Sequence, residues 1–162
     1  MPASVRPDWE SFVTENEHKL FRAALAILGD PAEAEDAVQD AFLRYLEKVP
    51  EDLENPAAWL MRVTVNGCKS RLRLKWRQVL PLSEALENQL QSREEREELT
   101  ELWALPPADR AVIHLYYYEG YATAEIAAMT GLRPAAVRSR LSRARQKLRK
   151  LLADSGEGGN IR

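Results

Sequence analysis

Arginine and lysine crowd one short stretch near the C-terminal end of the sequence. The stretch AVRSRLSRARQKLRK, residues 136–150, holds seven basic residues and no acidic one, although the whole chain has a formal net charge of −2. Guanidinium and ammonium groups donate hydrogen bonds to phosphate oxygens and to the acceptor edges of bases. The sequence therefore favours nucleic-acid binding here. A solvated basic face, a membrane-surface helix and an effector-groove helix are the alternatives.

Catalytic and metal-binding residue types are scarce. The chain has one cysteine, Cys68, and two histidines, His18 and His114, and none of them stands in a nucleophile–base pair or a metal-ligand pattern. We therefore expect no catalytic residues, no metal site and no cofactor. No apolar run approaches the roughly 20 residues of a membrane-spanning helix. The first 30 residues also lack a signal-peptide pattern, so we expect a cytoplasmic protein.

Proline and glycine mark the helices that must carry the basic side chains. Prolines cluster at Pro50 and Pro56 and again at Pro106 and Pro107, and no run of alternating apolar and polar residues lies between turn signals. This pattern predicts an all-α fold. The predicted helices span residues 7–28, 31–48, 56–77, 92–104, 107–119, 123–130 and 134–152.

Charge is sorted along the chain rather than mixed. Residues 62–77 contain six basic residues and residues 131–153 contain eight, and neither block has an acidic residue. Between them, residues 80–101 carry seven acids against two arginines. Two acid-free blocks in one short chain favour two binding faces over two solvated helices.

The C-terminal basic helix follows a short helix and a glycine turn. The segment EIAAMTGLRPAAVRSRL reads as a helix-turn-helix, in which Gly131 takes a positive φ and Pro134 opens the second helix. At about 100° per residue, the apolar side chains of the second helix share one narrow arc. They are Val137, Leu141, Ala144, Leu148, Leu151 and Leu152.

The helix predicted over residues 31–48 has an acidic face with a leucine at its centre. Its core side is predicted to hold Ala34, Ala37, Val38, Ala41, Phe42, Tyr45 and Leu46, and its outer side Asp36, Gln39, Asp40, Leu43 and Glu47. An exposed leucine ringed by acids and an amide is typical of the centre of a protein interface. The acids alone are also compatible with solvated charge, and metal binding would need a ligand loop.

The helix predicted over residues 56–77 has a polar stripe opposite an apolar face. The stripe holds Arg62, Asn66, Lys69, Ser70 and Arg73, and the apolar face holds Leu60, Met61, Val65, Cys68 and Leu72. Trp59 could stack on a base or cap the core, and we favour the core. We expect Cys68 to be a small buried residue.

Three stretches of the chain resemble successive regions of bacterial extracytoplasmic-function (ECF) sigma factors. Their DNA-binding region is similar to the segment LPPADRAVIHLYYYEGYATAEIAAMTGLRPAAVRSRLSRARQKLRKLL of this chain. Their polymerase-binding region is similar to the segment GDPAEAEDAVQDAFLRYLEKV, and their minus-ten reader is similar to AWLMRVTVNGCKSRLRLKWR. The resemblance implies two small helical domains joined by an acidic linker. It places sigma region 2 over residues 1–78, the linker over 79–92, sigma region 4 over 93–153 and a flexible tail over 154–162.

The resemblance also implies roles for the residues singled out above. The acidic face would bind the β′ coiled coil of core RNA polymerase, because Asp36, Gln39 and Asp40 match an Asp-x-x-Gln-acid motif of the family. The other partners that the resemblance implies are the β flap of the polymerase, promoter DNA and an anti-sigma factor. The implied minus-ten contacts are Arg62, Asn66, Lys69 and Arg73, beside a base-capturing loop over residues 50–58. The implied minus-thirty-five contacts are Arg138, Ser139, Ser142 and Arg143 for bases and Arg140, Arg145 and Lys147 for phosphates.

The chain departs from the family pattern at the first helix of the helix-turn-helix. Ala122 stands where relatives have a capping serine, and we expect Thr123 to take over the cap. The expected function is that of a sigma factor that recognises and opens the minus-ten element and binds the minus-thirty-five element. A sigma mimic that sequesters an anti-sigma protein and a stand-alone helix-turn-helix regulator are the alternatives.

Overall fold

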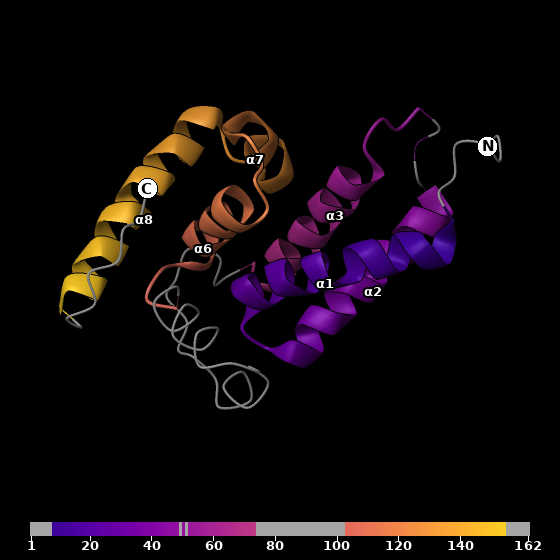
Figure 1. Cartoon of the computed structure of the whole chain (residues 1–162), viewed down its shortest axis with the longest axis horizontal. Coiled ribbons are helices and arrows are strands. Elements are labelled where there is room, and N and C mark those ends of the chain that lie inside the picture. The colour runs from indigo at the N-terminus through magenta and orange to yellow at the C-terminus, as the bar shows by residue number, and fades with distance from the viewer. Residues whose placement is uncertain (1–7, 49, 51, 74–102, 155–162) are drawn as a thin grey trace.

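The chain folds into two small helical bundles that pack against each other (Figure 1). The computed structural model describes residues 8–48, 50, 52–73 and 103–154, with side chains described as far as residue 150. These residues form helices and turns without any strand, which confirms the all-α prediction. The predicted linker over residues 79–92 and the tail from residue 155 onward lie outside the described residues.

The N-terminal bundle consists of three helices. They are α1 (Trp9–Leu28), α2 (Pro31–Lys48) and α3 (Pro56–Arg71), and each of the three packs against the other two. The side chain of Asp30 accepts the backbone N–H of Ala32, and that of Asn55 accepts the N–H of Ala58, so an oxygen caps the first turn of α2 and of α3. Local capping and proline at the first helical position explain why these starts were predictable.

The C-terminal bundle contains the helix-turn-helix. It consists of α6 (Pro107–Ile113), a π-helical turn η2 (His114–Tyr118), α7 (Thr123–Thr130) and α8 (Pro134–Asp154). Gly131 ends α7 with a φ of 76°, as predicted. The buried apolar residues of the two bundles form one hydrophobic core. Among the described helices, none has the length and apolar character needed to cross a membrane.

Three predicted helices differ from the structure. The helix predicted over residues 56–77 ends at Arg71, because Leu72 and Arg73 lie in a turn, so Arg73 of the predicted stripe follows α3 instead of lying on it. The helix predicted over residues 107–119 changes to π-helical hydrogen bonding at His114, where the N–H of Glu119 bonds the carbonyl of His114. The helix predicted over residues 92–104 does not reach its expected end, because Trp103 and Ala104 lie in a turn. The earlier part of that prediction, up to residue 102, lies outside the described residues.

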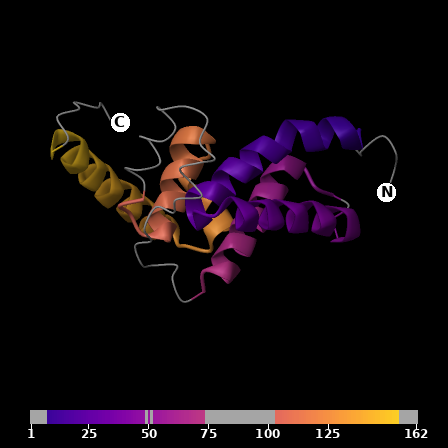
Figure 2. The same cartoon turned by 90° about the horizontal axis from the view of Figure 1, so that it is seen from below.

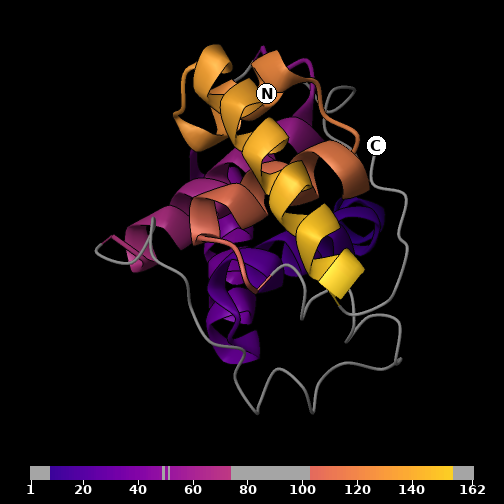
Figure 3. The same ribbon diagram turned by 90° about the vertical axis from the view of Figure 1, so that its left-hand side faces the viewer.

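The bundles meet along two helix pairs. Helix α1 packs against α6, and α3 packs against α7. Helix α8 lies at the far end of the molecule, on the side of α6 and α7 that faces away from α1–α3 (Figures 1 and 3). The view from below shows the same order, with α6 between α8 and the N-terminal bundle (Figure 2). One basic helix, α3, thus packs against the other bundle, whereas α8 lies at the far end of the molecule.

Candidate nucleic-acid interface and protein-docking face

Helix α8 presents a polar face to solvent. Its apolar arc is buried as predicted, with Val137, Leu141, Ala144 and Leu148 each less than a tenth exposed. The side chains of Leu151 and Leu152 lie beyond those described. Five of the predicted minus-thirty-five residues are exposed, namely Arg138, Ser139, Ser142, Arg143 and Lys147. The face therefore combines small hydroxyl side chains with long cationic ones, a combination suited to contact with a base edge and flanking phosphates.

Two arginines of α8 are engaged within the protein. Arg140 donates to Oδ1 of Asp109 at 2.6 Å, in an ion pair whose side chains are 16% and 12% exposed. Arg145 is half-buried and donates from Nε to the carbonyl of Leu141 at 3.2 Å. Both were predicted as phosphate contacts, and the structure places Arg140 in particular against α6 instead of on the open face.

The first helix of the helix-turn-helix begins without a side-chain cap. Ala122 is the residue before α7, and its own N–H donates to Oε1 of Glu125 at 2.9 Å. Thr123 is already the first helical residue, so the prediction that Thr123 takes over the cap is wrong. The reason is that Glu125 binds the backbone N–H of Ala122, which makes Ala122 the N-cap and Thr123 the first helical residue.

Helix α3 exposes only part of its predicted polar stripe. Arg62, Asn66, Ser70 and Arg73 are exposed, whereas Lys69 is half-buried and donates from Nζ to the carbonyl of Thr130 at 3.0 Å. Thr130 is the last residue of α7, next to the helix-turn-helix glycine. One of the four predicted minus-ten contacts, Lys69, is therefore bonded to the other bundle, and the other three are exposed.

The remaining residues of α3 contribute to packing. Trp59 packs against the core, with its ring 5.8 Å from that of Tyr45, which favours the structural interpretation of this tryptophan. Cys68 is fully buried, as predicted, and burial raises the pKa of its thiol to about 12. The predicted base-capturing loop at residues 50–58 leads into α3, and residue 51 lies outside the described part.

The acidic face of α2 is exposed as predicted. Its five residues, Asp36, Gln39, Asp40, Leu43 and Glu47, are all exposed, and Leu43 is 55% exposed. Leu46 is 54% exposed as well, so its assignment to the core side is wrong. Leu46 lies at the edge of the buried arc, between Tyr45 and Leu43, and the core does not extend that far around the helix. The face thus has two leucines among its acids.

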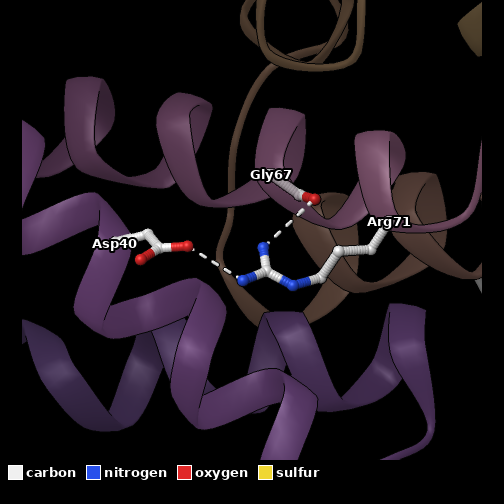
Figure 4. A network of polar contacts seen from close by, with 3 residues as sticks. All are labelled: Asp40, Gly67 and Arg71. Carbon is white, nitrogen blue, oxygen red and sulfur yellow. Dashed lines mark hydrogen bonds and ion pairs between the residues drawn. The ribbon is translucent and has the colours of Figure 1, made fainter.

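One acid of this face already has a partner in the N-terminal bundle. Arg71 of α3 donates to Oδ2 of Asp40 at 2.9 Å and to the carbonyl of Gly67 at 3.4 Å (Figure 4). The two side chains are 27% and 60% exposed, so water screens the pair. The role of Arg71 in this ion pair was not predicted from the sequence. The only sequence feature that indicates it is the position of Arg71 on a basic helix, one turn after Gly67.

Comparison with known proteins identifies both bundles. The Sigma-70 region 2 family matches residues 12–78, and the region 4 family of Sigma-70 matches residues 99–148. The chain is 36% identical over 154 residues to the probable RNA polymerase sigma factor RfaY of Xanthomonas campestris, of which it spans 38%. It is 30% identical to the ECF RNA polymerase sigma factor SigM of Mycobacterium tuberculosis, over 99% of this chain and 85% of SigM.

A solved structure extends the likeness to three dimensions. The sigma factor RpoE of Bartonella quintana, in complex with the anti-sigma factor NepR, matches with a TM-score of 0.74 at 27% identity. That match covers 90% of this chain and 97% of RpoE, so it includes both bundles. On these grounds, the chain belongs to the ECF sigma factors of bacterial RNA polymerase.

Proposed function

We propose that this chain brings core RNA polymerase to a restricted set of promoters through three separate faces. The acidic face of α2, centred on Leu43, binds polymerase. The stripe of α3 recognises and helps open the minus-ten element, and α8 binds the minus-thirty-five element. The observation that carries this proposal is that the exposed leucines of α2 lie among acids, while α3 and α8 expose arginines and have no acidic residue within 56–71 and 134–150.

The charges of these faces support the assignment. Promoter DNA is a polyanion, so it is attracted to Arg62 and Arg73 and to the open face of α8. The α2 face repels DNA and offers an apolar centre with a charged rim, which is the usual composition of a protein interface. We propose the division into region 2 over residues 1–78 and region 4 over residues 93–153 on the same grounds, and a cytoplasmic location alongside the polymerase.

An anti-sigma factor is the proposed regulatory partner. RpoE of Bartonella quintana was solved in complex with one, and its likeness to this chain includes both bundles. A partner of that class would compete with polymerase and DNA for the faces described above.

Run-off transcription with purified core RNA polymerase tests the proposal. The template is a promoter found by mapping transcript starts after overexpression. Asp36→Arg reverses the charge of an exposed residue on the α2 face, so we expect loss of run-off product and of copurification with polymerase. Glu17→Arg makes the same charge change at an exposed position on α1 and should transcribe normally.

The outcomes separate the proposed function from its alternatives. A sigma mimic would bind an anti-sigma protein but yield no product even as the unaltered chain. A stand-alone regulator would bind DNA without requiring polymerase. Loss of the helical circular dichroism signal in Asp36→Arg would show that Asp36 is a structural residue and not part of an interface.

A further inference from the structure

The two bundles are joined by an arginine that caps a helix of the other bundle. The last carbonyls of a helix have no partner within it. At the end of α1, the N–H of Gly29 bonds the carbonyl of Leu25. Arg110 of α6 supplies the next two bonds, from Nε to the carbonyl of Ala26 at 2.8 Å and from Nη2 to that of Ile27 at 2.6 Å. A cation at a helix C-terminus also complements the helix dipole.

The environment of Arg110 is unusual for a charged group. Its side chain is fully buried, its third bond runs from Nη1 to the carbonyl of Leu105 at 2.6 Å, and its guanidinium lies 3.9 Å from the centre of the Trp103 ring. The neighbouring carboxylate, Asp109, forms its ion pair with Arg140. Burial lowers the pKa of Arg110 to about 9, so the group is still charged at neutral pH. In the packed chain, the bonds to Ala26 and Ile27 help to offset the cost of removing the guanidinium from water, and these two bonds exist only while the bundles stay together.

Two further contacts span the same interface. Gly29 adopts a φ of +74°, and a Cβ built on it would lie 1.9 Å from Cη2 of Trp103, so the tryptophan ring occupies the space that a side chain would need. On the other helix pair, Lys69 of α3 bonds the carbonyl of Thr130 of α7. The contacts between α1 and α6 and between α3 and α7 therefore hold the bundles in one closed arrangement.

The closed arrangement is too short for a promoter. Minus-ten and minus-thirty-five elements lie about 25 base pairs apart by their names, which is about 85 Å at roughly 3.4 Å per base pair. A compact chain of 162 residues has a radius of gyration of roughly 15 Å. The faces of α3 and α8 cannot reach both elements unless the bundles separate, and separation breaks the bonds of Arg110 and Lys69.

We propose that Arg110, seated on the C-terminal end of α1 and against Trp103, is a latch that keeps the free chain closed and unable to engage both promoter elements. The proposal rests on the proposed sigma function, because that function requires the separation of the two DNA-binding faces. Opening exposes the carbonyls of Ala26 and Ile27 to water, hydrates the guanidinium and breaks the bond from Lys69 to Thr130.

A distance measurement in the full chain tests the latch. Glu35→Cys on α2 and Gln146→Cys on α8 place spin labels at exposed positions on the two bundles. Cys68 does not compete for the label, because it is buried and its thiol pKa is raised to about 12. Pulsed dipolar spectroscopy should give one short, narrow distance distribution for the free chain. The distance should lengthen when core polymerase and a promoter fragment are added.

A matched pair of glycine variants isolates the interface. Gly29→Ala and Gly120→Ala impose the same left-handed strain, since φ is +74° at Gly29 and +72° at Gly120. Only Gly29→Ala collides with Trp103, because nothing lies within 4 Å of a Cβ at Gly120. We expect Gly29→Ala to shift the free chain to long distances and Gly120→Ala to leave the distribution unchanged.

The proposal is overturned if the Gly29→Ala chain keeps the short distance between the spin labels. It is also overturned if the labels stay at that short distance when polymerase and the promoter fragment are bound. Should Gly29→Ala fail to fold, Arg110→Lys replaces it, because an ammonium cannot bond the carbonyls of Ala26, Ile27 and Leu105 in the geometry of the guanidinium. Unchanged closure in Arg110→Lys likewise overturns the latch. These distances of the free chain do not depend on transcription, so a chain that closes as described but yields no run-off product would contradict the proposed function and leave the latch intact.

Discussion

Helices α3 and α8 both carry basic residues on a polar face, but the protein uses those residues differently. Helix α3 lies between the rest of its own bundle and α7, and two of its cations are bonded to other helices, Lys69 to Thr130 and Arg71 to Asp40. Helix α8 makes its main helix–helix contacts with α6 and α7, which belong to its own bundle, and most of its polar face is open to solvent. One of its arginines, Arg140, is paired with Asp109.

The difference teaches that a count of basic residues does not measure a DNA-binding surface. In both helices, some cations hold the fold together and others face solvent. The exposed group, such as Arg143, is available to a ligand without any cost to the fold. The bonded group, such as Lys69 or Arg140, must first give up an internal partner. The comparison therefore predicts different consequences for variants that remove the same charge.

The largest effect on DNA binding is expected at Arg143. Its side chain is exposed at the centre of the α8 face, beside Ser142 and Ser139. Arg143→Ala should weaken binding to the minus-thirty-five element by about 1 to 3 kcal/mol if the side chain reads a base. Binding of promoter fragments with substitutions in that element, measured by fluorescence anisotropy, checks this and should show relaxed specificity at one base pair.

Lys147→Ala is the matched control on the same helix. It removes one exposed cation predicted to touch phosphate, so binding should weaken to a similar extent on every sequence and lose about one unit of salt dependence. A uniform loss on all sequences in Arg143→Ala as well would show that Arg143 contacts only phosphate.

A smaller effect, on stability, is expected at Arg140. Its ion pair with Asp109 is 2.6 Å long and largely buried, so Arg140→Ala leaves a carboxylate without its partner. We expect a loss of about 1 to 2 kcal/mol in the free energy of unfolding, with less effect on DNA affinity than Arg143→Ala. Urea denaturation measures the first quantity. An unchanged midpoint together with a large loss of DNA affinity would assign Arg140 to the DNA face after all.

Local signals explain how much of the fold was predictable. Helices α2 and α7 have the predicted bounds, because proline, aspartate and glycine act on the residues next to them. Helical geometry correctly predicted which residues of α2 form its exposed acidic face. It wrongly placed Leu46, at the edge of the buried arc, on the core side. The π-helical turn was missed, since the apolar pattern around His114 fits an α-helix equally well.

The partners of the bonded cations could not be predicted from sequence. Arg110 and Lys69 bond backbone carbonyls, which every residue has and which carry no sequence signature. The residues joined by these bonds are also 84 and 61 positions apart in the chain, so only the packing of the two bundles brings them together. Sequence analysis consequently placed Lys69 on a DNA face and did not single out Arg110.

The smallest loss of stability is expected for a variant of Arg71. Comparing this variant with Arg140→Ala tests whether the burial of an ion pair determines how much it stabilises the fold. Arg71–Asp40 and Arg140–Asp109 are both arginine–aspartate pairs between helices, but the side chains of the first pair are 27% and 60% exposed and those of the second 16% and 12%. Arg71→Ala should therefore cost only about 0.5 kcal/mol in urea denaturation. That cost should vanish at roughly 1 M salt, where the screening length falls to about 3 Å, whereas the cost of Arg140→Ala should persist. If the two variants lose equal stability and respond equally to salt, exposure does not govern these pairs, and the distinction drawn between α3 and α8 fails.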